Sequence, residues 1–374
     1  MTVRMREEGH VLARVRSRAL RRGSTMPIDE RELMRTAMDC AAVRHPHPNP
    51  RVGAVVLDAS GAIVGTGAHV EPGTPHAEVI ALAEAGPRSR GGTLIVTLEP
   101  CVHEGRTPPC TSAVLASGVA RVVIGAGDPD EQVAGKGIDA LRRAGLEVQV
   151  GVPGVDAETL DLGYFHHRRT GRPRVTLKTA ATLDGQVAAA DGSSHWITSP
   201  EARRDAHVLR SRSDAVLVGA GTVRADDPLL TVRIEGFEGR QPRPVILVGE
   251  RGIPPRSKLL SRDPLVYASH QVDVAGEVIV LPGAGGVDLD AVLEDLGKRD
   301  VVDLLVEGGP AVAGAFTRAG LVDHFVVYLG AAFAGGVGLS ALGGGFATIA
   351  DLIEVTITGV GRVGPDLRID AEPT

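Results

Sequence analysis

Residues 75–110 read PHAEVIALAEAGPRSRGGTLIVTLEPCVHEGRTPPC, and this stretch decides the fold of the N-terminal half. Apolar spacing predicts a helix over His76–Ala85, a buried strand over Thr93–Leu98 and a second helix over Cys110–Ser117. Strands that alternate with helices form mostly parallel sheets with helices on both faces. The stretch therefore predicts one α/β/α domain.

Further elements flank this stretch on both sides. Helical spacing predicts a helix over Ile28–Arg44 with Asp29 as its cap, and two apolar runs joined by Asp58–Gly61 predict a hairpin. Downstream, the pattern predicts a strand over Val119–Ala126, a helix over Lys136–Ala144 and a strand over Leu146–Val150.

His76, Cys101 and Cys110 are candidate metal ligands. One imidazole and two thiolates suit tetrahedral zinc, and the absence of a fourth obvious ligand leaves one position for water. Glu78 follows the histidine by two residues and is suited to move protons between that water and a leaving nitrogen. His-x-Glu combined with Pro-Cys and a second cysteine is typical of zinc-dependent nucleobase deaminases. Cys40 is better interpreted as a core thiol.

A second α/β domain is predicted after the basic segment Tyr164–Arg174, which interrupts the apolar periodicity. We place the boundary near Gly171, with a disordered segment or extension at 1–26, a first domain at 27–170 and a second domain at 171–374. Strands are predicted over Val175–Ala180, Ala215–Gly219, Pro244–Val248, Leu265–Ala268, Glu277–Leu281, Val302–Val306 and Phe325–Leu329, and helices over Pro200–Arg212, Asp288–Gly297 and Ala311–Ala319.

Composition excludes several classes of protein. The chain has 374 residues, a formal charge of −6 and only 3% aromatic residues, which argues against a nucleic-acid partner. Three cysteines cannot form a disulfide framework and fit a reducing cytoplasm. Phe325–Ala350 lacks charge, but its glycines indicate a strand followed by a loop, so no membrane span is expected.

Residues 1–25 are rich in arginine and lack the apolar core of a secretory signal. Three interpretations stay open: a disordered arm, an extension upstream of a start at Met26, or a transit peptide.

The N-terminal motifs carry a family resemblance. They are His47-Pro48-Asn49-Pro50, Pro75-His76-Ala77-Glu78, Glu99-Pro100-Cys101 and Gly105-Arg106-Thr107-Pro108-Pro109-Cys110. Together they resemble the deaminase half of the bifunctional riboflavin biosynthesis deaminase–reductase family, in which eight residues separate the two cysteines. The resemblance implies that Asn49, His103 and Arg106 bind substrate, with Arg106 near its phosphate. Val102 and Glu104 depart from the family pattern, and so does Asp130, where the family carries an asparagine.

Motifs of the second half resemble the reductase half of the same family, and the resemblance covers about residues 27 to 370. It implies a dihydrofolate-reductase-like fold. The implied cofactor contacts are Ala180, Trp196, Thr222, Asp226 and the turn Gly309, Pro310, Ala311, Val312, Ala313, Gly314 and Ala315. The implied substrate contacts are Ser194, Arg210, Leu230, Arg233 and Glu307, with Lys178 as a catalytic group. From the residues alone, a strand that ends in Glu307-Gly308-Gly309 before a helix favours an anion.

The resemblance implies a bifunctional enzyme of riboflavin biosynthesis that uses Zn²⁺ and NADPH. Its first reaction is zinc-hydroxide deamination of 2,5-diamino-6-ribosylamino-4(3H)-pyrimidinone 5′-phosphate. The second reduces the ribosyl group to ribityl, giving 5-amino-6-ribitylamino-uracil 5′-phosphate. We expect a cytoplasmic homo-oligomer whose partner is this small molecule. Two alternatives stay open: a nucleoside or tRNA deaminase with a non-catalytic binding module, and a fusion in which only the reductase works.

Overall fold

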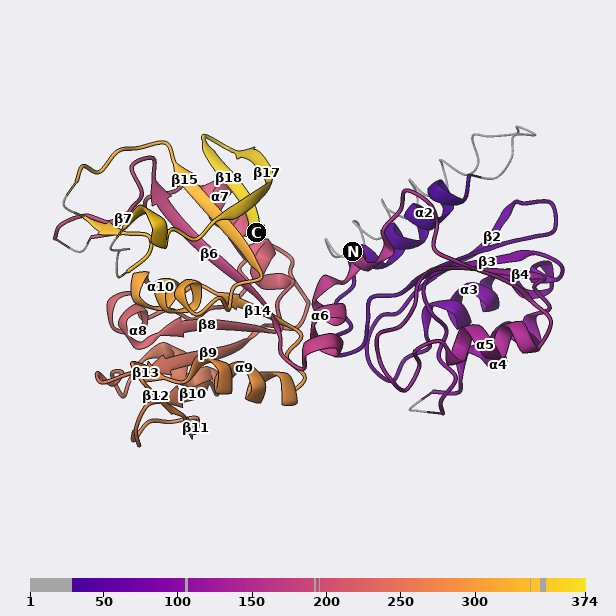
Figure 1. The fold of residues 1–374 in the computed structure, drawn as a ribbon, viewed down its shortest axis with the longest axis horizontal. Helices are drawn as coiled ribbons and strands as arrows, with labels where there is room; N and C mark the ends of the chain where they lie inside the picture. The colour runs from indigo at the N-terminus through magenta and orange to yellow at the C-terminus, as the bar shows by residue number, and fades with distance from the viewer. Residues whose placement is uncertain (1–28, 105–106, 192, 195, 337, 344–347) are drawn as a thin grey trace. The chain divides into compact units, whose positions relative to one another are not determined.

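A computed structural model describes residues 29–104, 107–191, 193–194, 196–336, 338–343 and 348–374. The chain divides between Thr170 and Gly171 into two compact units, which are described separately below (Figure 1). Among the described residues, no helix is both long and apolar enough to cross a lipid bilayer.

The first unit is built on a five-stranded sheet of order β2-β1-β3-β4-β5. The strands are β1 (Gly53–Leu57), β2 (Ile63–Ala68), β3 (Thr93–Leu98), β4 (Arg121–Ala126) and β5 (Glu147–Val150). Strands β3, β4 and β5 are parallel, whereas β1 is antiparallel to both of its neighbours. The helices are α2 (Glu30–Ala42), α3 (Ala77–Ala85), α4 (Cys110–Ser117), α5 (Lys136–Arg143) and α6 (Leu162–Thr170).

Helices cover both faces of this sheet, with α2 on one face and α3, α4 and α5 on the other (Figure 1). Two glycines set the close approach of helix to strand. A Cβ on Gly53 would lie 1.8 Å from the carbonyl oxygen of Ala37 in α2, and one on Gly67 would lie 2.2 Å from that of Ala77 in α3. Because Gly67 pairs with Ala54, the residue after Gly53, the two glycines face opposite sides of the sheet.

The second unit contains a nine-stranded sheet of order β11-β10-β9-β8-β14-β6-β15-β18-β17. Its strands are β6 (Arg174–Thr182), β8 (Ala215–Gly219), β9 (Arg243–Val248), β10 (Leu265–Ala268), β11 (Glu277–Val280), β14 (Asp303–Val306), β15 (His324–Gly330), β17 (Val355–Val363) and β18 (Asp366–Pro373). Short strands β7 (Gln186–Ala188), β12 (Pro282–Gly283), β13 (Gly286–Val287) and β16 (Leu339–Ser340) form two separate ribbons. Strands β17 and β18 run antiparallel at one edge, whereas the other seven strands of the large sheet are parallel.

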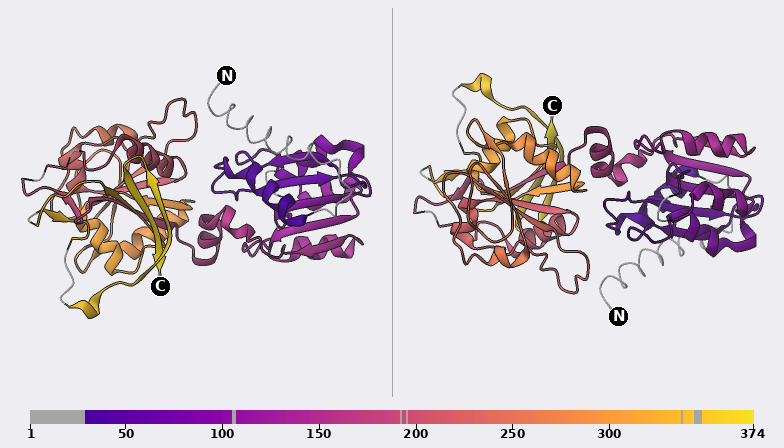
Figure 2. Two further views of the ribbon diagram at one scale, coloured as in Figure 1. Left: turned by 90° about the horizontal axis from the view of Figure 1, so that it is seen from above. Right: turned by 90° about the horizontal axis from the view of Figure 1, so that it is seen from below.

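Helices lie on both faces of the large sheet (Figure 2). They are α7 (Pro200–Ser211), α8 (Ala220–Asp226), α9 (Leu289–Lys298) and α10 (Pro310–Arg318). Alternate residues of β8 belong to two hydrophobic cores, one on each face of the sheet. Leu217 packs in the core that contains Val292 of α9 and Phe316 of α10. Val216 packs in the core that contains Val223 of α8.

The chain therefore leaves the neighbouring strands β8 and β14 toward opposite faces, through α8 and α10 respectively. Such a switch point at the carboxyl ends of parallel strands is where open α/β sheets bind ligands.

Most predicted helices and strands are confirmed within two residues at each end, but several others were missed. Strands β17 and β18, helix α8 and helix α6 were not predicted. The segment Tyr164–Arg174 interrupts the apolar periodicity, yet its first part belongs to α6, which continues to Thr170. The guanidinium groups of Arg168 and Arg169 each lie 5.1 Å from an aromatic ring of the same helix, so its basic residues are part of its packing.

Candidate active sites

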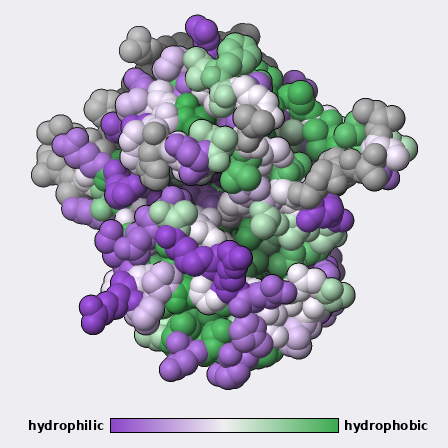
Figure 3. Space-filling view, turned by 90° about the vertical axis from the view of Figure 1, so that its left-hand side faces the viewer, coloured by the Kyte–Doolittle hydropathy of each residue, from purple (hydrophilic) through white to green (hydrophobic). Residues whose placement is uncertain are grey.

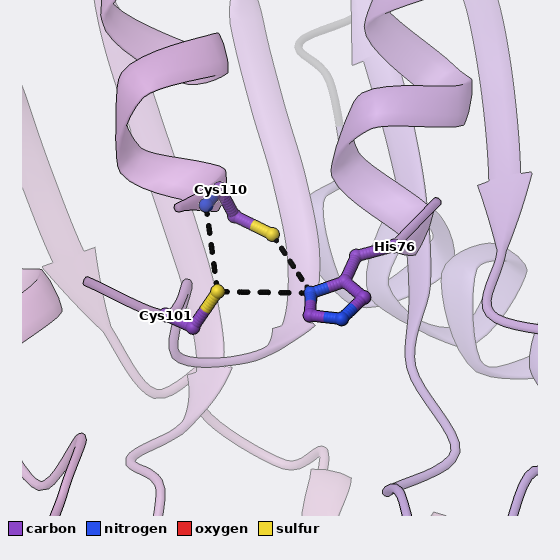
Figure 4. A group of neighbouring side chains, drawn as sticks. All are labelled: His76, Cys101 and Cys110. Carbon is purple, nitrogen blue, oxygen red and sulfur yellow. Dashed lines mark hydrogen bonds between the residues drawn. The ribbon is translucent and has the colours of Figure 1, made fainter. Parts of the chain in front are cut away.

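The three predicted metal ligands meet in the first unit (Figure 4). His76 precedes α3, Cys110 begins α4, and Cys101 lies in the loop after β3. His76 Nδ1 is 3.0 Å from Cys110 Sγ and 3.6 Å from Cys101 Sγ, and the three ligand atoms all lie within 4.8 Å of one another. One imidazole and two thiols at this spacing fit a zinc ion.

The local charges favour a thiolate in this cluster. Cys101 Sγ accepts the backbone N–H of Cys110 at 3.4 Å, at the first turn of α4. Hydrogen bonds from Cys110 and His76 lower the pKa of Cys101 to about 4, even though burial opposes this. The same hydrogen bond with Cys101 raises the pKa of Cys110. A divalent cation would stabilise both thiolates at once.

Glu78 lies in the first turn of α3 and its residue is only 3% exposed. Burial raises the pKa of its carboxyl to about 7, and its surroundings include Cys110 and His76. A carboxyl with a pKa near neutrality can both accept and return a proton.

Two residues that sequence reasoning missed hold the His76 ring. Thr107 Oγ1 lies 3.4 Å from Nε2, the ring nitrogen directed away from the thiols. The His69 ring packs edge-on against His76 at 5.0 Å, and His69 Nε2 is 3.0 Å from Asn49 Nδ2. Asn49 therefore reaches the cluster through His69. His69 precedes His76 by seven residues, a spacing that carried no signal on its own.

The other residues that the sequence analysis singled out in the deaminase unit lie in loops around the metal-ligand cluster. His103 is exposed in the loop after Cys101. Arg106 lies outside the described residues. Asp130 follows β4, whose carboxyl end lies beside that of β3 because the two strands are parallel.

In the second unit, Arg210, Glu307 and Lys178 meet at the switch point. Arg210 binds Glu307 in a bidentate ion pair, with Nε–Oε1 at 2.8 Å and Nη2–Oε2 at 2.6 Å. Lys178 lies beside Glu307 because the residues before them, Leu177 in β6 and Val306 in β14, pair in the sheet. Its ammonium lies 5.7 Å from the centre of the Tyr328 ring.

The charges of this group are interdependent. Burial alone would raise the pKa of Glu307, but Arg210 and Lys178 hold it below its usual value. Burial lowers the pKa of Lys178, and the nearby Glu307 carboxylate opposes that effect. Lys178 is therefore a cation that gives up its proton more readily than an exposed lysine.

Arg233 and His207 lie beside this group. The backbone nitrogen of Arg233 lies 3.3 Å from His207 Nδ1, and its Nε lies 3.3 Å from His207 Nε2. Burial and the charges of Arg210 and Arg233 lower the pKa of His207 to about 4. Leu230 precedes this segment with a positive φ of 52°, a strained conformation for a branched side chain. The histidine was missed by sequence reasoning.

The predicted cofactor-binding turn, Gly309–Ala315, forms the N-terminal part of α10. The Gly309 N–H donates to Thr222 Oγ1 at 3.2 Å, which joins the starts of α8 and α10. A Cβ on Gly308 would lie 2.5 Å from Val312 Cβ, so glycine is needed for this close turn. The predicted residues Pro310, Ala311, Ala313, Gly314 and Ala315 all lie in α10.

The remaining predicted residues are dispersed around this turn. Ala180 pairs with Tyr328 in β15, and Asp226 ends α8. Ser194 is partly buried, whereas Trp196 is 67% exposed with the Arg203 guanidinium 4.3 Å from its ring centre. On the face shown in Figure 3, polar and apolar side chains are intermixed.

We expect that loss of the Arg210–Glu307 ion pair strongly destabilises the second unit. Arg210→Met should lower the free energy of unfolding of the second unit by about 3 kcal/mol, because the variant leaves a carboxylate whose side chain is only 9% exposed without its cation. Urea unfolding followed by the fluorescence of Trp196, the single tryptophan, measures this. Arg224→Met, which removes an exposed arginine bonded to loop carbonyls, should change it by less than about 0.5 kcal/mol. Equal effects would contradict the role assigned to the ion pair.

Fold and site together define the class of protein: a zinc-binding deaminase unit followed by a reductase unit. Residues 27–126 match the family model of the cytidine and deoxycytidylate deaminase zinc-binding region. Residues 173–369 match that of the RibD C-terminal domain.

The chain belongs to the RibD family of riboflavin biosynthesis proteins and is a bifunctional enzyme. It is 42% identical to the riboflavin biosynthesis protein RibD of Aquifex aeolicus over 91% of this chain and 97% of that protein. A solved structure of Acinetobacter baumannii RibD matches with a TM-score of 0.85 and 34% identity, covering 92% of this chain and 99% of the other.

A second solved structure, from Thermotoga maritima, is described as a diaminohydroxyphosphoribosylaminopyrimidine deaminase/5-amino-6-(5-phosphoribosylamino)uracil reductase. It matches with a TM-score of 0.84 and 33% identity over 92% of this chain and 99% of that chain. The expected fold class, a cytidine-deaminase-like unit followed by a reductase unit, is confirmed.

Proposed function

We propose that this chain deaminates 2,5-diamino-6-ribosylamino-4(3H)-pyrimidinone 5′-phosphate and then reduces the ribosyl group of the product to ribityl. The observation that carries the proposal is the occurrence in one chain of a His76–Cys101–Cys110 cluster beside a buried Glu78 and a charged switch-point site. The Thermotoga maritima structure, whose description carries both activities, supports the choice of substrate.

In the deaminase unit, His76, Cys101 and Cys110 would hold zinc. When bound, zinc supplies a water molecule of lowered pKa at the reacting carbon. Glu78 takes a proton on its carboxylate and returns it to the departing nitrogen, so that one water enters and one ammonia leaves. Asn49 would contact the pyrimidine, and its contact with His69, which packs on His76, supports this role.

In the reductase unit, the turn from Gly309 to Ala315 and Thr222 would hold NADPH, which supplies a hydride. The start of α10 suits its phosphates because a helix N-terminus favours anions. Lys178 donates a proton to the sugar ring oxygen, and the ring opens to a protonated imine whose C1′ accepts the hydride. Glu307 accepts hydrogen bonds from sugar hydroxyls, and Arg233 pairs with the substrate phosphate. Arg210 mainly orients Glu307, because its Nε, Nη1 and Nη2 are already bonded within the protein.

We further propose a cytoplasmic homo-oligomer. Three cysteines without a disulfide support the compartment. The exposed apolar side chains Val355, Ile357 and Val360 on the edge strand β17 support association of copies. The assembled metal-ligand cluster argues against a chain in which only the reductase works.

Two steady-state assays test the proposed order. Ammonia release from the diaminopyrimidine substrate should proceed without NADPH, and NADPH oxidation should start only after ammonia appears. If the deaminated intermediate is supplied instead, NADPH oxidation should begin at once. NADPH oxidation that precedes ammonia release would contradict the proposed order.

A further inference from the structure

Helix α6 connects two loops of the deaminase unit through one arginine. Arg168 Nη2 donates to the carbonyl of Pro48 at 3.5 Å, in the loop that carries Asn49. Arg168 Nε lies 3.4 Å from Asp130 Oδ2, in the loop that follows β4. The guanidinium also lies over the Tyr164 ring at 5.1 Å, which holds it in this position.

Helix α6 also binds the loop after β4 through a second residue, Tyr164. Tyr164 donates its hydroxyl hydrogen to Asp128 Oδ1 at 3.0 Å, and this oxygen also accepts the backbone N–H of Asp130 at 2.9 Å. Asp130 Oδ1 in turn accepts the N–H of Gln132 at 2.9 Å. The Asp130 carboxylate is therefore contacted on both oxygens: Oδ1 accepts a hydrogen bond within its own loop, and Oδ2 forms an ion pair with Arg168.

Both loops border the metal-ligand cluster. Asn49 reaches His76 through His69. The loop after β4 is tied to the residues before Cys101, because Glu99 accepts the N–H of Asp128 at 3.3 Å and that of Gly135 at 2.9 Å. The Asp130 carboxylate therefore places a negative charge at the edge of a site whose proposed substrate is an anion.

We propose that Arg168 is a positioning residue of the deaminase: it neutralises Asp130 and fixes the Asn49 and Asp130 loops relative to each other at the substrate side of the cluster. Side-chain exposures of 25% for Arg168 and 27% for Asp130 leave the pair only partly screened by water. Without the guanidinium, the carboxylate repels the substrate phosphate and the two loops lose their common anchor. The inference rests on the proposed substrate.

The test is a double-mutant cycle on the full-length, zinc-loaded chain. Arg168→Gln should raise KM for the diaminopyrimidine substrate about tenfold, with kcat and zinc content within about twofold of the parent, because the lost interaction is mainly one of charge with bound substrate. Asp130→Asn alone should not raise KM, because it removes the carboxylate that repels the substrate phosphate. The double variant should match Asp130→Asn, because an amide needs no neutralising cation.

Arg169→Gln is the matched control. Arg169 lies in the same helix, pairs with Glu158 at 2.8 Å and lies 5.1 Å from the Phe165 ring, yet its partners belong to neither loop. Its KM should stay within about twofold of the parent.

The outcomes separate this inference from the proposed function. A parent chain that releases no ammonia from this substrate contradicts the proposed function itself. If the parent deaminates but the Arg168→Gln and Asp130→Asn effects simply add, Arg168 acts by packing and the inference is wrong. An unchanged KM in Arg168→Gln also overturns it.

Discussion

Glu78→Gln should reduce deamination by about 10³-fold or more while zinc content stays unchanged, because the substitution removes proton transfer and leaves the three ligand side chains in place. The amide occupies the same volume in a buried position of the first turn of α3. Ammonia release, metal analysis and NADPH oxidation with the deaminated intermediate measure the three properties on one preparation. The reductase rate should equal that of the parent chain.

Glu84→Gln provides the control for this substitution. Glu84 lies in the same helix, where its carboxylate accepts the N–H of Thr66 at 2.8 Å on an exposed surface. Its deaminase rate should stay within about twofold of the parent. If Glu78→Gln loses zinc together with activity, Glu78 supports the metal site rather than proton transfer, and its proposed role is wrong.

Lys178→Met should reduce NADPH oxidation by about 10²-fold or more, since general acid catalysis and the charge beside Glu307 are lost together. Methionine retains most of the apolar length that packs near the Tyr328 ring. The deaminase rate of the variant should be unchanged, so the chain should accumulate deaminated intermediate even when NADPH is present.

Lys298→Met is the corresponding control, because Lys298 is an exposed residue of α9 that pairs with Glu294 at 3.9 Å. Its reductase rate should equal that of the parent. A Lys178→Met chain with parental kcat and parental KM would show that Lys178 only packs against its neighbours. A changed KM with parental kcat would indicate substrate binding without proton transfer.

The metal-ligand cluster could be predicted from the sequence because its chemistry is concentrated in short motifs. His76 and Glu78 lie two residues apart, and both cysteines follow prolines at element boundaries. The strand and helix that bracket these motifs have strong apolar periodicity, which fixes where the ligands are presented. The structure then brings the ligand atoms within 4.8 Å of one another.

Contacts that depend on distant side chains could not be predicted in this way. Helix α6 has a narrow buried face and a basic surface, so its pattern resembled a break in structure. The partner that neutralises Asp130 lies 38 positions away in that helix, and no local pattern connects the two residues. The bidentate binding of Arg210 to Glu307 likewise depends on tertiary packing, and no local pattern in the sequence connects the two residues.

The most direct test of the account is mass spectrometry of the product that the pure, zinc-loaded chain forms from the diaminopyrimidine ribosylamino phosphate. Without NADPH, the account predicts that one amino group is replaced by oxygen and nothing else changes. With NADPH, the product should gain two further hydrogens. Unchanged substrate in both reactions, or addition of hydrogens before loss of the amine, would contradict the claim that this chain carries out both steps in that order.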